Sequence, residues 1–119
     1  MKHVVKKNDT LQKLAAYYYG DWSIYRFLQD YNQIEELVTG QVLMIPSPPQ
    51  REEEHIIQEG HTYRAISLQY YQTEHFSEKV REYNQNIILS EHIGEILFIP
   101  PLVNFKKYQK TLKRLEGRY

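Results

Sequence analysis

The stretch NDTLQKLAAYYYG, residues 8–20, sets the pattern from which the rest of the chain can be understood. Asn8-Asp9-Thr10 predicts a turn that ends in helix-capping side chains, because their oxygens can accept hydrogen bonds from the first free amides of a helix. Gly20 predicts the C-terminal end of that helix. Between them, apolar side chains spaced three and four residues apart predict one buried helical face, made of Leu11, Leu14, Ala15 and Tyr18.

Much of this pattern returns as GHTYRAISLQYYQ, residues 60–72. A fixed register over more than forty residues predicts two copies of one small unit. At a shift of fifty-two the identical pairs are His3/His55, Thr10/Thr62, Tyr18/Tyr70, Tyr19/Tyr71, Tyr31/Tyr83, Asn32/Asn84 and Gln33/Gln85. After a two-residue insertion the shift becomes fifty-four, with Gly40/Gly94, Leu43/Leu97, Ile45/Ile99 and Pro46/Pro100.

Each copy has the pattern strand, helix, helix, strand. In the first copy, HVVK at 3–6 predicts a short β-branched strand. Ser23 is the expected cap of a second helix, and Gly40 precedes a second strand, QVLMI at 41–45. We therefore expect an α+β fold of two tandem βααβ units, each a two-stranded antiparallel sheet packed on two helices. The second helix has the stripe Ile24, Phe27, Leu28 and Tyr31.

Residues 3–46 resemble the LysM domain, a small βααβ module. The match includes Asp9-Thr10-Leu11, Leu14-Ala15, Tyr18-Tyr19-Gly20-Asp21, Asn32, Leu37, Gly40-Gln41-Val42-Leu43 and Ile45-Pro46. Residues 55–100 match more loosely: His61 replaces the Asp, and Gln72-Thr73 replaces Gly-Asp. The resemblance implies one of two functions. Most LysM domains bind N-acetylglucosamine polymers such as peptidoglycan or chitin. Others make protein contacts in phage tails and contractile machines, and the second copy resembles the small phage tail protein X family.

The resemblance implies a glycan groove in the first copy, between the strand-to-helix loop and the loop after the second helix. Exposed amides and a carboxylate could hold acetamide groups there, and apolar residues could pack on the sugar face. The alternative is that Asp9 or Thr10 caps the helix and Leu37 closes the core. The candidate glycan-binding residues are Asp9, Thr10, Ile34, Leu37 and Gly40.

The two copies also serve as an internal control for partner contacts. Trp22, Tyr25 and Phe27 correspond to Glu74, Ser77 and Lys79, so the shared fold does not demand an aromatic residue at these positions. Aromatic side chains at such positions are typical interface anchors. They are therefore candidate partner contacts, with packing against the other copy or the C-terminal tail as the alternative.

The C-terminal tail predicts a basic amphipathic helix capped by Asn104. Such a short helix is marginal alone, so another surface must bury its apolar face. That surface could be the chain itself, a neighbouring subunit or, least favoured, a membrane; we favour the neighbour. The candidate contacts are Phe105, Tyr108, Leu112, Leu115 and Tyr119 on the apolar face, with Lys106, Lys107 and Lys110 among the basic residues.

Composition excludes several classes of site. The chain has no cysteine, so disulfides and thiolate metal sites are absent, and its formal net charge is zero, which gives no reason to expect nucleic acid. No catalytic or phosphate-binding motif is present, and the five histidines are scattered, so we expect neither an enzyme nor a cofactor. Glu52 to Glu54 beside His55 could bind a metal, but a solvated linker is favoured. The expected divisions are 1–46, a linker at 47–54, 55–101 and a tail at 102–119.

These patterns favour a structural subunit of a phage tail or contractile-injection baseplate. Its partners would be neighbouring subunits in a multi-copy hetero-assembly, and peptidoglycan binding is the alternative function. The N-terminal residues lack the apolar segment of a signal peptide. We therefore expect assembly in the host cytoplasm and a final place in the virion.

Overall fold

The computed structural model describes residues 1–117 and divides the chain into two compact units. Unit 1 comprises Met1–Gln50 together with the C-terminal segment from Leu102. Unit 2 comprises Arg51–Pro101. The tail is thus part of the first unit rather than a separate element.

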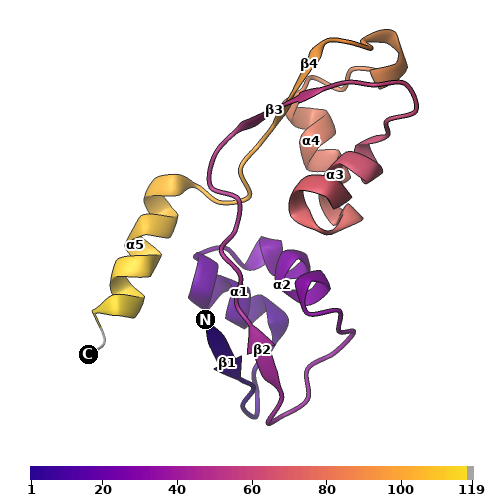
Figure 1. Ribbon diagram of the computed structural model, residues 1–119. Helices are drawn as coiled ribbons and strands as arrows, with labels where there is room; N and C mark the ends of the chain where they lie inside the picture. Colours follow the sequence, from indigo (N-terminus) through magenta and orange to yellow (C-terminus); the bar gives the residue numbers. More distant parts are fainter. Residues whose placement is uncertain (118–119) are drawn as a thin grey trace. The chain divides into compact units, whose positions relative to one another are not determined.

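Unit 1 contains the predicted strand–helix–helix–strand order (Figure 1). Its two strands pair antiparallel, with Lys2 opposite Met44 and Val4 opposite Val42. The elements are β1 (Lys2–Val4), α1 (Leu11–Tyr19), a 3₁₀ turn η1 (Trp22–Ile24), α2 (Tyr25–Tyr31) and β2 (Val42–Met44).

Unit 2 repeats this order, and its strands also pair antiparallel, with Glu54 opposite Phe98 and Ile56 opposite Ile96. Its first strand begins inside the segment expected to be linker, because the backbone at Glu53 already pairs with that at Ile99. The elements are β3 (Glu53–Ile56), α3 (Tyr63–Tyr71), η2 (Glu74–Phe76), α4 (Ser77–Tyr83), η3 (Leu89–Glu91) and β4 (Ile96–Ile99). The α+β fold of two tandem βααβ units is confirmed.

Within each unit, equivalent side-chain hydrogen bonds join the second helix to the second strand. The Asn32 amide donates to the Met44 carbonyl at 2.9 Å and accepts from the Met44 N–H at 2.9 Å, which ties the end of α2 to β2. Asn84 makes the equivalent pair of bonds with Phe98, at 2.7 and 2.9 Å. This shared use explains why the asparagine recurs in the repeat.

The buried tyrosine of each unit is the second of the recurring pair. Tyr19 is 2% exposed and its hydroxyl donates to the Pro46 carbonyl at 2.8 Å. Tyr71 is equally buried and donates to the Pro100 carbonyl at 2.5 Å. The sequence prediction that placed Tyr18 on the core face was wrong, because the core stripe continues from Ala15 to Tyr19, one helical turn on.

Asp21, not Ser23, caps the second helical segment. Its carboxylate accepts from the Ser23 N–H at 2.9 Å and starts the 3₁₀ turn η1, from which α2 continues. Ile24, Phe27 and Leu28 are buried as predicted, whereas Tyr31 is exposed. The prediction was wrong at Ser23, because the chain enters the helix through a tighter turn that Asp21 caps, and at Tyr31, whose side chain is 41% exposed.

The tail forms α5 (Phe105–Glu116), which packs against α1 of its own unit. The Asn104 side chain accepts from the Lys107 N–H at 3.0 Å, so the predicted cap is confirmed. Tyr108 and Thr111 are buried. Arg114 lies over the Tyr17 ring, 4.8 Å from its centre, and donates to the Tyr17 carbonyl.

Candidate functional site

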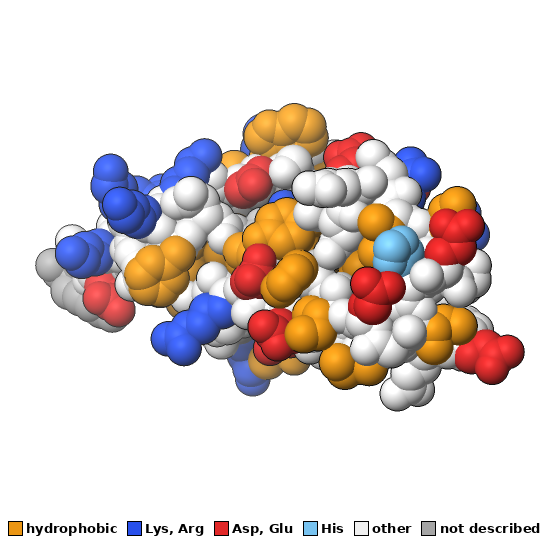
Figure 2. Space-filling view, turned by 90° about the horizontal axis from the view of Figure 1, so that it is seen from above, with side chains coloured by type: hydrophobic (Ala, Val, Ile, Leu, Met, Phe, Trp, Pro, Cys, Tyr) orange, Lys and Arg blue, Asp and Glu red, His pale blue; other side chains and the backbone are white. Residues whose placement is uncertain are grey.

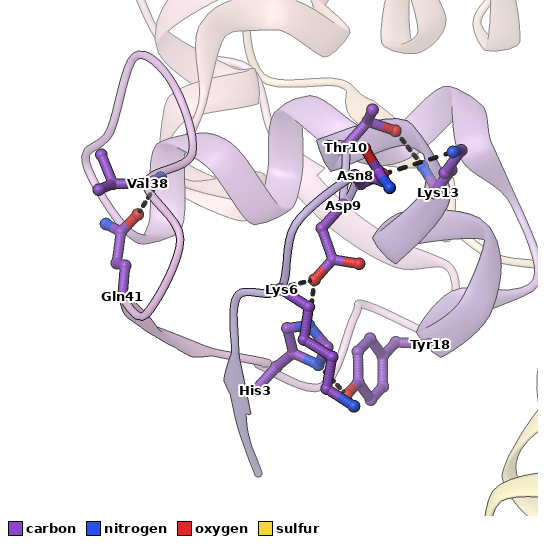
Figure 3. A network of polar contacts seen from close by, with 9 residues as sticks. All are labelled: His3, Lys6, Asn8, Asp9, Thr10, Lys13, Tyr18, Val38 and Gln41. Atoms are coloured by element: carbon purple, nitrogen blue, oxygen red, sulfur yellow. Dashed lines mark hydrogen bonds and ion pairs between the residues drawn. The ribbon is translucent and has the colours of Figure 1, made fainter.

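His3 on β1 organises the polar side chains at the start of unit 1 (Figure 3). Its Nδ1 lies 2.6 Å from the Tyr18 hydroxyl on α1, and its Nε2 lies 2.9 Å from a carboxylate oxygen of Asp9. The Lys6 N–H donates to the same Asp9 oxygen at 2.8 Å. These two hydrogen bonds hold the pKa of Asp9 below its usual value, and the bond with His3 has the larger effect.

An open pocket of about 520 Å³ lies beside this network, between β1 and α1. Its lining combines three lysines with two aromatic rings and the Asp9 carboxylate. Such a mixture could attract an anionic group and pack a ring of a ligand on the tyrosines. The lining residues are Lys2, His3, Val4, Lys6, Asp9, Lys13, Leu14, Tyr17 and Tyr18.

The predicted glycan-binding residues do not converge on this pocket. Of the five, only Asp9 lines it, and its carboxylate points toward His3 and the Lys6 amide (Figure 3). Thr10 caps α1 by accepting from the Lys13 N–H at 3.0 Å, as the structural alternative proposed. Gly40 has φ of +89° and donates its N–H to the Val5 carbonyl at 2.8 Å, which closes the turn before β2. Ile34 and Leu37 are partly buried.

Unit 2 keeps the network but replaces its carboxylate with an imidazole. His55 Nδ1 lies 2.8 Å from the Tyr70 hydroxyl, and its Nε2 lies 2.9 Å from His61 Nδ1. The basic residues of the pocket are lost as well. The counterparts of Lys2, Lys6, Lys13 and Tyr17 are Glu54, Gln58, Ala65 and Gln69. Unit 2 therefore lacks most of the residues that give the unit 1 pocket its basic and aromatic character.

The three aromatic partner candidates have different surroundings. Trp22 is 62% exposed, in keeping with a contact residue, and Tyr25 is partly buried, with the Arg26 guanidinium 5.2 Å from its ring centre. Phe27 is 4% exposed and packs on Tyr19, with ring centres 5.9 Å apart. Phe27 is therefore a core residue, and the prediction that it contacts a partner was wrong.

The two units supply one core aromatic ring from different positions in the repeat. In unit 2, Phe76 packs on Tyr71 at 5.7 Å, whereas its counterpart in unit 1 is Ile24. Phe27 fills the equivalent space from one helical turn further on. Comparing the two copies misassigned Phe27 as a contact residue, because each core takes the ring that packs on its buried tyrosine from a different sequence position.

The apolar face of α5 is covered in part by its own unit. Tyr108 is buried, and Leu112 and Leu115 line a smaller pocket of about 270 Å³ with Tyr18 and Tyr19. Among the expected alternatives, docking on its own chain is the one the structure shows, which leaves Tyr108 unavailable to a neighbour. Phe105 remains exposed, as do Lys106, Lys107 and Lys110, whereas Tyr119 lies outside the described residues. Figure 2 shows the basic side chains clustered around α5.

Each sheet exposes an apolar face that the sequence interpretation missed. Six side chains on these faces are between 40% and 55% exposed. The signal was present in the sequence, because both alternating phases of β2 and β4 are apolar, whereas a half-buried strand alternates apolar with polar. Figure 2 shows hydrophobic side chains intermixed with acidic ones over unit 2. The exposed residues are Val4, Val42 and Met44 in unit 1, and Ile56, Ile96 and Phe98 in unit 2.

Residues 1–117 offer neither a metal-binding cluster nor a membrane-spanning helix. No group of three or more His, Asp or Glu side chains there is arranged to hold a metal ion. Glu52, which the sequence placed near His55, instead accepts a hydrogen bond from Tyr83 at 2.5 Å. No helix in the same part of the chain is both long and apolar enough to cross a membrane.

Comparison with known proteins found no family model that matches the sequence and no matching curated protein.

Proposed function

We propose that this chain is a non-enzymatic structural subunit of a phage tail or contractile-injection baseplate, in which the LysM-like units contact neighbouring proteins. The observation that carries the proposal is the pair of apolar sheet faces, which occur at equivalent positions of both units. Contiguous exposed apolar side chains mark interaction surfaces, whereas isolated ones are ordinary.

Two exposed aromatic residues add to this support. Trp22 at the start of η1 and Phe105 at the start of α5 are both more than half exposed. Large aromatic side chains supply much of the binding energy at protein interfaces. In this proposal they extend the contact surface of unit 1 beyond its sheet.

Peptidoglycan binding by unit 1 is the second candidate, and the pocket between β1 and α1 favours it. Tyr17 and Tyr18 offer rings for a sugar face, and Lys6 and Lys13 offer positive charge for the carboxylates of the peptide stems. Unit 2 has lost most of these residues, so this candidate involves unit 1 only.

Co-sedimentation with purified peptidoglycan sacculi, at low and high salt, separates the two candidates. The pocket variant Lys6→Gln/Lys13→Ala/Tyr17→Gln gives unit 1 the residues that unit 2 carries. The control Lys106→Gln/Lys110→Gln removes the same number of lysines from α5, because exposed positive charges bind anionic polymers without specificity. The structural proposal predicts no salt-resistant binding. Salt-resistant binding that only the pocket variant loses would establish the peptidoglycan alternative.

The structural proposal also predicts where the protein is found. Mass spectrometry of purified phage or injection particles from the source of this sequence should detect the chain in fixed proportion to other tail subunits. Its absence from washed particles would contradict the proposal.

A further inference from the structure

The exposed faces of the two sheets are equivalent, position by position. In unit 1 the outward residues pair as Lys2 with Met44 and Val4 with Val42. In unit 2 they pair as Glu54 with Phe98 and Ile56 with Ile96. The intervening residues turn toward the helices, since Leu43 and Leu97 are almost fully buried. Each face therefore consists of three apolar side chains and one charged side chain at the same corner.

The charged corner has opposite signs in the two units: Lys2 in unit 1 and Glu54 in unit 2. Both side chains are exposed, and neither forms an ion pair with any residue in the described range 1–117. Two faces of like shape with opposite charge at the corresponding position are complementary.

We propose that the sheet face of unit 1 packs on the sheet face of unit 2 in a second copy of this chain, with Lys2 paired to Glu54. Two unit 1 faces would oppose lysines and two unit 2 faces would oppose glutamates, so the charges select the mixed pairing. The inference rests on the proposed use of these faces as protein contacts, and it names the partner.

The mixed pairing determines the kind of assembly. Each copy carries one face of each type, so the contact is head-to-tail and generates either a closed ring, of which the reciprocal pair of chains is the smallest, or a filament. Each face presents only three apolar side chains, and small contacts belong to weak, transient associations. Association in dilute solution should therefore depend on protein concentration and weaken as salt screens the exposed ion pair.

Sedimentation velocity over a concentration series, at low and high salt, tests the proposal. The wild-type protein should form larger species as concentration rises. Lys2→Glu leaves a glutamate on both faces, and Glu54→Lys leaves a lysine on both, so each variant alone should remain monomeric. An equimolar mixture of the two variants restores opposite charges at both kinds of contact and should associate again. The doubly exchanged variant Lys2→Glu/Glu54→Lys should behave as wild type.

Matched variants separate the apolar contribution from a general loss of hydrophobic surface. Phe98→Ser on the unit 2 face should weaken association, whereas Ile88→Ser, which changes a comparably exposed side chain outside both sheets, should not. Circular dichroism checks that each variant is folded. A wild-type protein that stays monomeric, or single charge variants that associate as wild type does, would overturn the inference. Failure of the mixture to associate would overturn it as well.

The outcomes for self-association and for the proposed function are distinct. A chain that stays monomeric in solution but is recovered in purified particles would overturn the self-association alone. A chain that associates through these faces but is absent from particles would overturn the tail or baseplate role and leave the contact standing.

Discussion

His55 Nε2 lies 2.9 Å from His61 Nδ1, and this contact fixes the proton positions of both rings. The Gln58 N–H also points at His61 Nδ1, at 3.3 Å, so that nitrogen accepts hydrogen bonds. His55 must therefore donate from Nε2 and accept the Tyr70 hydroxyl at Nδ1. His55 is uncharged in this arrangement. Unit 1 has a carboxylate, Asp9, where unit 2 has His61.

The two units should lose stability in different acidic ranges. Burial, and then the charge of His61, lower the folded-state pKa of His55 below 6.5. The unfolded state therefore binds the proton more readily, and the stability of unit 2 falls as the pH drops below about 6.5. The pKa of Asp9 is lowered below 3.8, so its contribution to unit 1 is retained until the pH falls below about 4. Hydrogen exchange measured on peptides from each unit would follow them separately.

His61→Asp and Asp9→His are reciprocal variants for this pH dependence. His61→Asp gives unit 2 the carboxylate of unit 1, which favours a charged His55, so the loss of stability below about pH 6.5 should disappear. Asp9→His should introduce that sensitivity into unit 1. Trp22 is the sole tryptophan of the chain and lies in unit 1, so its fluorescence reports the second variant. Unchanged acid profiles in both variants would contradict the assigned proton positions.

Removing the hydroxyl of either core tyrosine should weaken its unit. Tyr19→Phe and Tyr71→Phe each leave a proline carbonyl without its donor, and an unsatisfied buried polar group costs about 1–3 kcal/mol. Chemical denaturation measures the free energy of unfolding, followed for Tyr19→Phe by Trp22 fluorescence. The control Tyr31→Phe alters an exposed tyrosine and should change stability by no more than a few tenths of a kcal/mol. Equal effects at Tyr19 and Tyr31 would argue against the carbonyl bond.

The internal repeat made the fold predictable because the residues whose side chains hydrogen-bond to the backbone occur in both copies. Asn32 and Asn84, Thr10 and Thr62, and the buried tyrosines make the same hydrogen bonds in each unit. Positions that must satisfy a backbone group tolerate few substitutions, so they remain identical when surrounding residues diverge. The strand, helix, helix, strand order follows from these positions and the apolar spacing between them.

The candidate site was less predictable because it depends on side-chain packing. Phe27 differs in type from its counterpart yet fills the core, since Phe76 supplies the ring in unit 2 from another position. The docking of α5 on α1 depends on the shape of the surface around Tyr17 and Gly20, which apolar periodicity does not encode. The outward sheet faces were missed because the helical stripes do not account for the second apolar phase of β2 and β4.

Phe27→Ala should be strongly destabilising, in contrast to a residue that serves a partner contact. A buried phenylalanine truncated to alanine costs about 3–5 kcal/mol through lost burial and the cavity left behind. Lys79→Ala changes the equivalent, exposed position of unit 2 and should cost less than about 0.5 kcal/mol. Thermal denaturation of the two variants makes the comparison. A Phe27→Ala protein as stable as wild type would contradict its place in the core.

Gly20→Ala should release α5 from unit 1. An added Cβ would lie 2.6 Å from the Thr111 Oγ1 of α5, at a residue whose φ of +74° also disfavours a side chain. Gly40→Ala is the matched control, because its φ is +89° with no atom within 4 Å of the added carbon, so it carries the backbone cost without the clash. Hydrogen exchange of peptides from α5 should speed up in Gly20→Ala and not in Gly40→Ala. Adding Thr111→Ala to Gly20→Ala removes the clashing oxygen and should restore part of the protection. Equal protection of α5 in both glycine variants would mean that close contact at Gly20 does not hold the helix in place.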